Sequence, residues 1–134
     1  MINAIYLVLL FSIFGNNSQK LYQKDYFANG YLKSEGWMIK KQKVDYWFFY
    51  YENKSIKEEG HYSNNQKCKW WTFYNSKEEV IKKCEFLNDK MDGLCIVYEQ
   101  GTIIRAEKYK LGKKVNQWNT LAEFKKDNAL SRLE

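Results

Sequence analysis

A repeat with a period of 24 residues runs along most of the chain and constrains its fold more than any other feature. The segment "YFANGYLKSEG" at Tyr26–Gly36 recurs as "YYENKSIKEEG" at Tyr50–Gly60, again from Tyr74 and Tyr98, and in part from Phe124. Such a period is typical of arrays in which each unit buries its apolar residues against its neighbours. We expect four units and a partial fifth, at residues 26–49, 50–73, 74–97, 98–123 and 124–134.

Aligned copies share four columns of apolar residues, and these columns predict which side chains are buried. The columns are Tyr26, Tyr50, Tyr74, Tyr98 and Phe124; Leu32, Ile56, Val80, Ile104 and Leu130; Met38, Tyr62, Phe86 and Tyr109; and Trp47, Trp71, Cys95 and Trp118.

Within each unit the spacing is that of a β-hairpin. In the first arm, Leu32, Ser34, Gly36 and Met38 fall on one face by the two-residue period of a strand. A polar turn such as Asn64–Lys67 follows, and the second arm is dense in aromatic and β-branched residues, which favour strands. Aromatic residues make up 18% of the chain and proline is absent. We therefore predict an all-β fold, a single-layer antiparallel β-meander of stacked hairpin repeats.

The first eighteen residues contain no charged side chain, and Ala4–Gly15 form an apolar run about as long as the core of a signal peptide. We predict a signal peptide at residues 1–18, helical if retained, and a mature repeat domain at residues 19–134. The predicted location is secreted or periplasmic. Because no Lys or Arg precedes the apolar run, an uncleaved anchor and a start site set too far upstream stay open as alternatives.

The C-terminal segment allows two structures. Thr120–Glu123 matches a capping box, which would open a helix. Against this, Phe124–Leu130 reproduces the spacing of Tyr50–Ile56 in the second unit. We prefer the strand, as the start of the partial fifth unit.

The repeat resembles the MORN-repeat variant of bacterial antitoxin-like proteins, the YwqK-type family. The resemblance is carried by Tyr26–Gly36, Tyr50–Gly60 and "NDKMDGLCIVYEQG" at Asn88–Gly101, and it covers about residues 22–134. It implies a non-enzymatic array of β-hairpins that binds or scaffolds, with toxin neutralisation as the usual role. The Asp-Gly of the motif survives at Asp92-Gly93, whereas the units of Trp47 and Trp71 have lost the glycine.

The histidine and cysteines suggest chemistry that their spacing does not support. His61, Cys68, Cys84 and Cys95 are zinc-ligand types, but no two of them stand two to four residues apart, as structural zinc sites require. We predict no metal, no cofactor and no enzymatic activity. Cys84 and Cys95 lie on the two arms of one hairpin, where they can face each other and form a disulfide. The alternative is that both are small buried thiols.

Four aromatic residues fall out of phase with the buried columns and form the candidate binding face: Trp37, Phe48, Tyr51 and Trp70. Exposed rings can contact a protein, a sugar or a base, although a second buried face would also explain them. We expect the partner to be another protein, with a cell-wall glycan or an anionic lipid surface as alternatives. The net charge of +6 is spread along the chain without a compact basic block, so nucleic acid is not an expected partner.

Overall fold

The computed structural model describes residues 18–128. The predicted signal peptide, up to residue 17, and residues 129–134 of the predicted fifth unit lie outside the described residues. The elements are β1 Lys20–Tyr26, β2 Leu32–Ile39, β3 Gln42–Tyr50, β4 Ile56–Ser63, β5 Gln66–Tyr74, β6 Val80–Leu87, β7 Lys90–Glu99, β8 Thr102–Lys110, β9 Lys113–Trp118 and α1 Leu121–Asp127.

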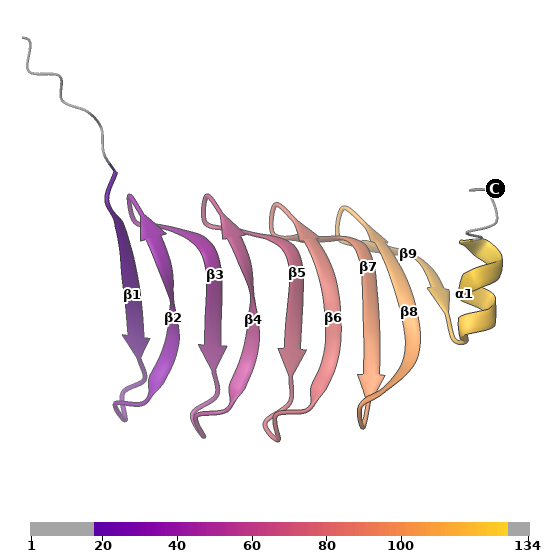
Figure 1. Cartoon of the computed structure of the whole chain (residues 1–134), viewed down its shortest axis with the longest axis horizontal. Helices are drawn as coiled ribbons and strands as arrows, with labels where there is room; N and C mark the ends of the chain where they lie inside the picture. The colour runs from indigo at the N-terminus through magenta and orange to yellow at the C-terminus, as the bar shows by residue number, and fades with distance from the viewer. Residues whose placement is uncertain (1–17, 129–134) are drawn as a thin grey trace, which may run out of the picture.

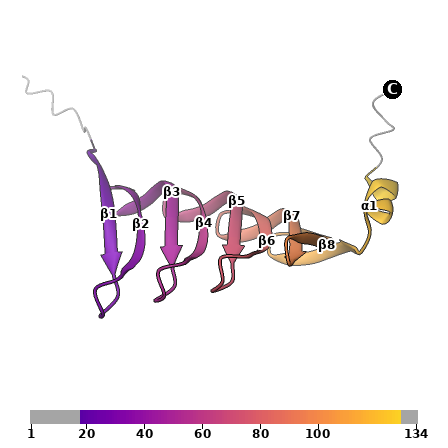
Figure 2. The ribbon, with the colours of Figure 1, turned by 60° about the horizontal axis from the view of Figure 1, so that its bottom comes forward.

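The strands form one antiparallel sheet in which spatial order equals chain order, from β1 to β9 (Figure 1). Successive hairpins follow one another along a single axis (Figures 1 and 2), and α1 lies at the end next to β9 (Figure 1). The predicted all-β single-layer meander is confirmed. Each strand pairs only with its neighbours in sequence, as expected when every connection is a short turn.

The first two hairpins are built on a glycine that faces a tryptophan. Gly36 lies opposite Trp47 in register, and Gly60 lies opposite Trp71. Both tryptophans are 0% exposed, and a methyl group on either glycine would overlap the facing indole ring. A flat indole can lie against the sheet only where the opposite residue has no side chain, which explains why the two residue types recur together.

We call the side of the sheet that carries Trp47, Phe49 and Trp71 the core face. Phe49 links the two tryptophans, with ring centroids 6.1 Å from Trp47 and 6.2 Å from Trp71. The ammonium groups of Lys43 and Lys67 lie over the indoles at 5.0 and 4.0 Å, so that the lysine stems cover the rings. A single layer thereby buries its tryptophans without a second sheet.

In the third hairpin a disulfide replaces the glycine and tryptophan pair. Cys84 and Cys95 lie opposite each other in register, both are buried, and their sulfur atoms are bonded. They occupy the positions of Gly60 and Trp71 in the preceding unit. Cys68 is the free thiol among the three cysteines.

A bulge precedes the tryptophan in the first hairpin. Gly36 pairs with Trp47 but the next residue, Trp37, pairs with Val44, so two residues of β3 have no partner on β2. The bulge frees the Trp37 carbonyl oxygen, which accepts a hydrogen bond from Trp47 Nε1 at 2.9 Å. Equivalent bulges in the first three units contain a residue in the left-handed region: Asp45 (φ 57°), Lys69 (φ 59°) and Gly93 (φ 118°).

The fourth hairpin differs, and this corrects the predicted position of Trp118. β9 has one unpaired residue, Val115, where β3 has two. Gln117 consequently lies opposite Glu107 on the core face, and Trp118 lies opposite Ala106 on the other face. Trp118 is buried, as predicted, but the expectation that it continues the column of Trp47 and Trp71 on the core face is wrong. A one-residue change in a bulge reverses the face of every later side chain.

The strand preferred for Phe124–Leu130 is also wrong, because α1 occupies Leu121–Asp127. The Thr120 side chain accepts a hydrogen bond from the Glu123 amide at 3.1 Å, and the Glu123 carboxylate accepts one from the Asn119 amide at 2.7 Å. These local bonds satisfy the first turn of the helix and outweigh the match of this segment to the repeat. The capping-box alternative was the correct one.

Turns of successive units are hydrogen bonded to each other along the rim of the sheet. The Asn65 backbone N–H donates to the Lys43 carbonyl oxygen at 2.9 Å, and Asn65 Oδ1 accepts from the Lys43 backbone N–H at 3.3 Å. Asp89 makes the same two bonds with Lys67, at 3.1 and 2.7 Å. Neighbouring units are therefore joined by their turns as well as by their strands.

Candidate functional site

The side of the sheet opposite the core face, here called the open face, carries apolar side chains along its whole length. Within residues 18–128 no second sheet covers this side (Figures 1 and 2). The strand registers assign to it Trp37, Tyr46, Phe48, Trp70, Leu94, Ile96 and Trp118.

Trp37 and Trp70, two of the predicted binding residues, are the exposed tryptophans of the open face. Trp37 is 37% exposed, and its ring meets the edge of Tyr22 with centroids 5.0 Å apart. Trp70 is 42% exposed and lies opposite Glu85 in register. Trp70 therefore offers an accessible ring, while the Glu85 carboxylate accepts a hydrogen bond from the Leu94 backbone amide on β7 at 2.6 Å.

The other two predicted residues are placed differently from each other. Phe48 lies on the open face, half-buried, with its ring 5.1 Å from that of Tyr46. Tyr51 follows β3 in a turn at the rim, where its hydroxyl donates to the Tyr74 carbonyl oxygen at 2.8 Å. The structure thus brings Trp37, Phe48 and Trp70 to one face, whereas Tyr51 links consecutive units.

Two carboxylates are held between tyrosines on the open face. The hydroxyl of Tyr50 donates to Glu35 at 2.7 Å, and Tyr74 repeats the bond to Glu59 at 2.6 Å. Burial and these bonds raise the pKa of Tyr50 and of Tyr74. Burial also acts to raise the pKa of Glu35, but hydrogen bonds from Tyr50 and Lys24 outweigh it and lower that pKa overall. Glu35 is consequently ionised at neutral pH, as a fixed acceptor rather than a proton donor.

His61 lies on the open face opposite the free thiol of Cys68. Its imidazole meets the edge of Tyr46 with centroids 4.8 Å apart. Burial, with a smaller effect of the Lys69 charge, lowers the pKa of His61, so the ring is neutral at pH 7. In the part of the chain that the structure describes, no three His, Cys, Asp or Glu residues are grouped as metal ligands.

A groove opens at the C-terminal end of the open face, between α1 and strands β7 to β9. Its volume is about 660 Å³, within the range of small-molecule and side-chain pockets. The Trp118 ring packs edge-on against Phe124 at 5.1 Å, and its Nε1 donates to Asp127 at 2.8 Å, which fixes the helix beside the sheet. The apolar lining residues are Leu94, Ile96, Ile103, Ile104, Ala106, Trp118, Leu121 and Phe124.

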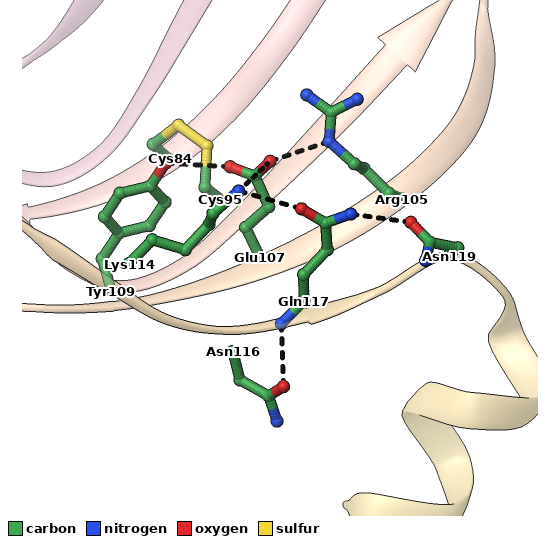
Figure 3. A network of polar contacts seen from close by, with 9 residues as sticks. All are labelled: Cys84, Cys95, Arg105, Glu107, Tyr109, Lys114, Asn116, Gln117 and Asn119. Atoms are coloured by element: carbon green, nitrogen blue, oxygen red, sulfur yellow. Dashed lines mark hydrogen bonds and ion pairs between the residues drawn. A yellow bond between two sulfur atoms is a disulfide. The ribbon is translucent and has the colours of Figure 1, made fainter.

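Polar groups replace the aromatic ladder on the core face of the fourth hairpin (Figure 3). Glu107, next to the disulfide and 5% exposed, accepts from Arg105 Nε at 2.7 Å and from the Tyr109 hydroxyl at 2.9 Å. Lys114 lies 3.6 Å from the same carboxylate and donates to Gln117 at 2.9 Å. Burial acts to raise the pKa of Glu107, but the bonds from Arg105 and Tyr109 lower it overall. The buried charge is therefore fully paired, and the network closes the end of the core.

Comparisons with known proteins do not assign the chain to a family. No family model matches it, and no curated protein matches it. Within residues 18–128, no helix is both long enough and apolar enough to cross a membrane.

The groove is the part of the site that sequence reasoning missed. It depends on two features, the helix at Leu121–Asp127 and the rotation of Trp118 onto the open face. The capping box at Thr120 pointed to the helix. For Trp118 the spacing carried no signal, because Tyr109 and Trp118 stand nine residues apart, as Met38 and Trp47 do.

Proposed function

We propose that this chain is a non-catalytic repeat scaffold that binds another protein through its open face. The observation that carries the proposal is that Trp37 and Trp70, 37% and 42% exposed, lie on the open face of a single-layer sheet that ends in an apolar groove. Exposed tryptophan rings beside an apolar groove are typical of an interaction surface. The core face is closed by lysines and by the Glu107 network, which leaves the open face for binding.

Trp70 and the groove are the expected anchors. Large rings and pockets near the centre of an interface contribute most of the binding free energy, because they are fully desolvated in the complex. Trp70 lies midway along the sheet, and Leu94 on the next hairpin begins the groove. The resemblance to antitoxin-like MORN-repeat proteins and the apolar N-terminal segment extend the proposal to an exported, antitoxin-like binder.

The test is a quantitative capture of partners by the full chain from extracts of its own organism. Trp70→Ala and Leu94→Ser are expected to reduce capture of the same protein about tenfold or more, as for central interface residues. Leu111→Ala is the matched control, because Leu111 is 63% exposed but lies in the turn after β8. Equal loss in all three variants, or no loss in any, would contradict the proposal.

A glycan is the second candidate because Trp70 presents an accessible ring, which suits stacking on a sugar. Cell-wall fragments retained by the wild type and lost in Trp70→Ala, with no protein enriched, would select this alternative. Retention on anionic vesicles that disappears with salt and is unchanged in Trp70→Ala would select lipid binding.

A further inference from the structure

The two ends of the sheet are finished in different ways. At the β9 end, the Gln117 amide donates to the Asn116 side chain at 2.8 Å, and α1 follows, held by Trp118 and Asp127. At the β1 end, all seven residues of the strand are exposed, and β2 is the only strand paired with it in residues 18–128. The side-chain contact from Gln23 to the Lys24 carbonyl oxygen is long, at 3.4 Å. The outer edge of β1 therefore presents backbone donors and acceptors that can pair with another strand.

The lysines of β1 do not guard this edge in the usual way. Edge strands are often protected by lysines whose free charge repels an incoming strand. Here Lys20 forms an ion pair with Asp45 and lies over the Trp37 ring at 4.7 Å. Lys24 forms an ion pair with Glu35 at 3.4 Å. Both ammonium groups are drawn back toward their own sheet.

We infer that β1 pairs antiparallel with β1 of a second copy, which joins two sheets into one continuous sheet about a two-fold axis at Gln23. An antiparallel pair of identical strands that keeps the two faces aligned must place one residue opposite itself. With Gln23 on the axis, all seven residues from Lys20 to Tyr26 find a partner. This inference is independent of the proposed function.

The side chains of β1 favour this register over the neighbouring ones. With Gln23 on the axis, Lys20 faces Tyr26 of the second copy, Tyr22 faces Lys24, and Leu21 faces Asp25. Moving the axis to Tyr22 places Lys20 opposite Lys24, and moving it to Lys24 places that lysine opposite itself, which is unfavourable. In the Gln23 register the aliphatic stem of each lysine packs on an aromatic ring, while its ammonium group keeps its ion pair within its own sheet.

The dimer would extend the open face. Lys20, Tyr22, Lys24 and Tyr26 lie on that face, since Tyr22 contacts Trp37 there and strand residues alternate. Two copies would thus share one open face, with Tyr22 and Trp37 near its centre. The two C-terminal grooves would lie at its far ends.

The test is site-specific disulfide trapping in the full chain with Cys68→Ser, which removes the free thiol. Under mild oxidation Gln23→Cys is expected to double the chain mass from 16.2 kDa, because each new thiol faces its own copy. The matched control is Leu21→Cys, which faces Asp25 of the second copy and should form no cross-link alone. A mixture of Leu21→Cys and Asp25→Cys chains should restore the dimer.

Trapping by Gln23→Cys but not by Leu21→Cys, with rescue in the mixture, supports the pairing and its register. Equal trapping of both single variants, or none, overturns it. If residues 1–17 cover the edge instead, Gln23→Cys stays at the monomer mass, which also overturns the inference. Circular dichroism of each variant verifies that the sheet is intact, as expected for substitutions at exposed positions of β1.

Discussion

At the scale of the residue, the bulges determine which side chains reach the core. In the first three units a left-handed residue turns the strand so that Trp47, Trp71 and Cys95 face the core. Of these three left-handed residues, Gly93 alone is a glycine. Asp45 and Lys69 also have a positive φ, with a side chain attached, which costs free energy because Cβ crowds the backbone there.

Lys69→Gly should therefore stabilise the protein, by about 0.5–1 kcal/mol after allowance for the greater freedom of glycine in the unfolded chain. Urea unfolding measures the change. Asn116→Gly is the matched control: Asn116 holds the same position in the fourth unit but has no positive φ, so this substitution should be neutral or destabilising. A gain in both variants would show that the left-handed backbone is not the cause.

Burial raises the pKa of Tyr62 to about 12, with smaller contributions from Glu58 and Asp89, against an ordinary value of 10.0. Between pH 10 and 12 the folded protein then holds a proton that the unfolded chain has lost, so stability falls as the pH rises through this window. Tyr62→Phe should make the fall less steep, because its ring cannot ionise. Unfolding free energies measured from pH 8 to 12 test this, and parallel curves for the two proteins would contradict it.

At the scale of the element, each hairpin accommodates one cross-strand pair at the core position. Glycine with tryptophan and cysteine with cysteine occupy the same register in adjacent hairpins. Each pair fills the space in its own way, since an indole needs a bare backbone opposite while a disulfide needs two short side chains. The two residues of a pair should therefore be exchangeable only together.

The double variant Cys84→Gly with Cys95→Trp should fold, because it copies Gly60 and Trp71 from the preceding hairpin. Cys95→Trp alone should be less stable than the double variant by about 1–3 kcal/mol, since the indole would overlap the Cys84 side chain. Urea unfolding of both in reducing buffer makes the comparison independent of the disulfide. Equal stability would mean that the glycine is not required by the tryptophan.

The elements also show how far the sequence predicts this structure. Period and columns located the hairpins because each column residue, such as Trp47 or Trp71, repeats both its spacing and its face. Trp118 was misplaced because its face depends on the number of residues in a bulge, which spacing to the neighbouring columns does not reveal. The groove requires the helix that begins at Leu121. The sequence of this segment contains both a capping box, which favours the helix, and a match to the repeat, which favours a strand. The sequence alone therefore did not decide between them.

At the scale of the whole molecule, stability is distributed among neighbours. Each strand pairs only with the strands before and after it, and the rim bonds of Asn65 and Asp89 join adjacent units only. A destabilising substitution in one hairpin should therefore affect mainly that hairpin and the strands paired with it.

Gly36→Ala should loosen the N-terminal end selectively, because the added methyl overlaps Trp47. Hydrogen exchange followed by mass spectrometry is expected to show faster exchange in β1 to β3, with β7 to β9 protected as in the wild type. The strands around the Cys84–Cys95 disulfide serve as the internal reference. Faster exchange of equal size along the entire sheet would contradict a nearest-neighbour account.

The identity of chain order and spatial order also has a mechanical consequence. Because β1 and β9 form opposite edges of the sheet, a force that separates the two ends of the chain acts across the strands rather than along them. The hydrogen bonds between strands would then break one after another, and each hairpin would unfold and lengthen the chain at low force. The disulfide between Cys84 and Cys95, which stand eleven residues apart, would keep the segment between them closed. The chain would then extend to less than its full contour length until the disulfide is reduced.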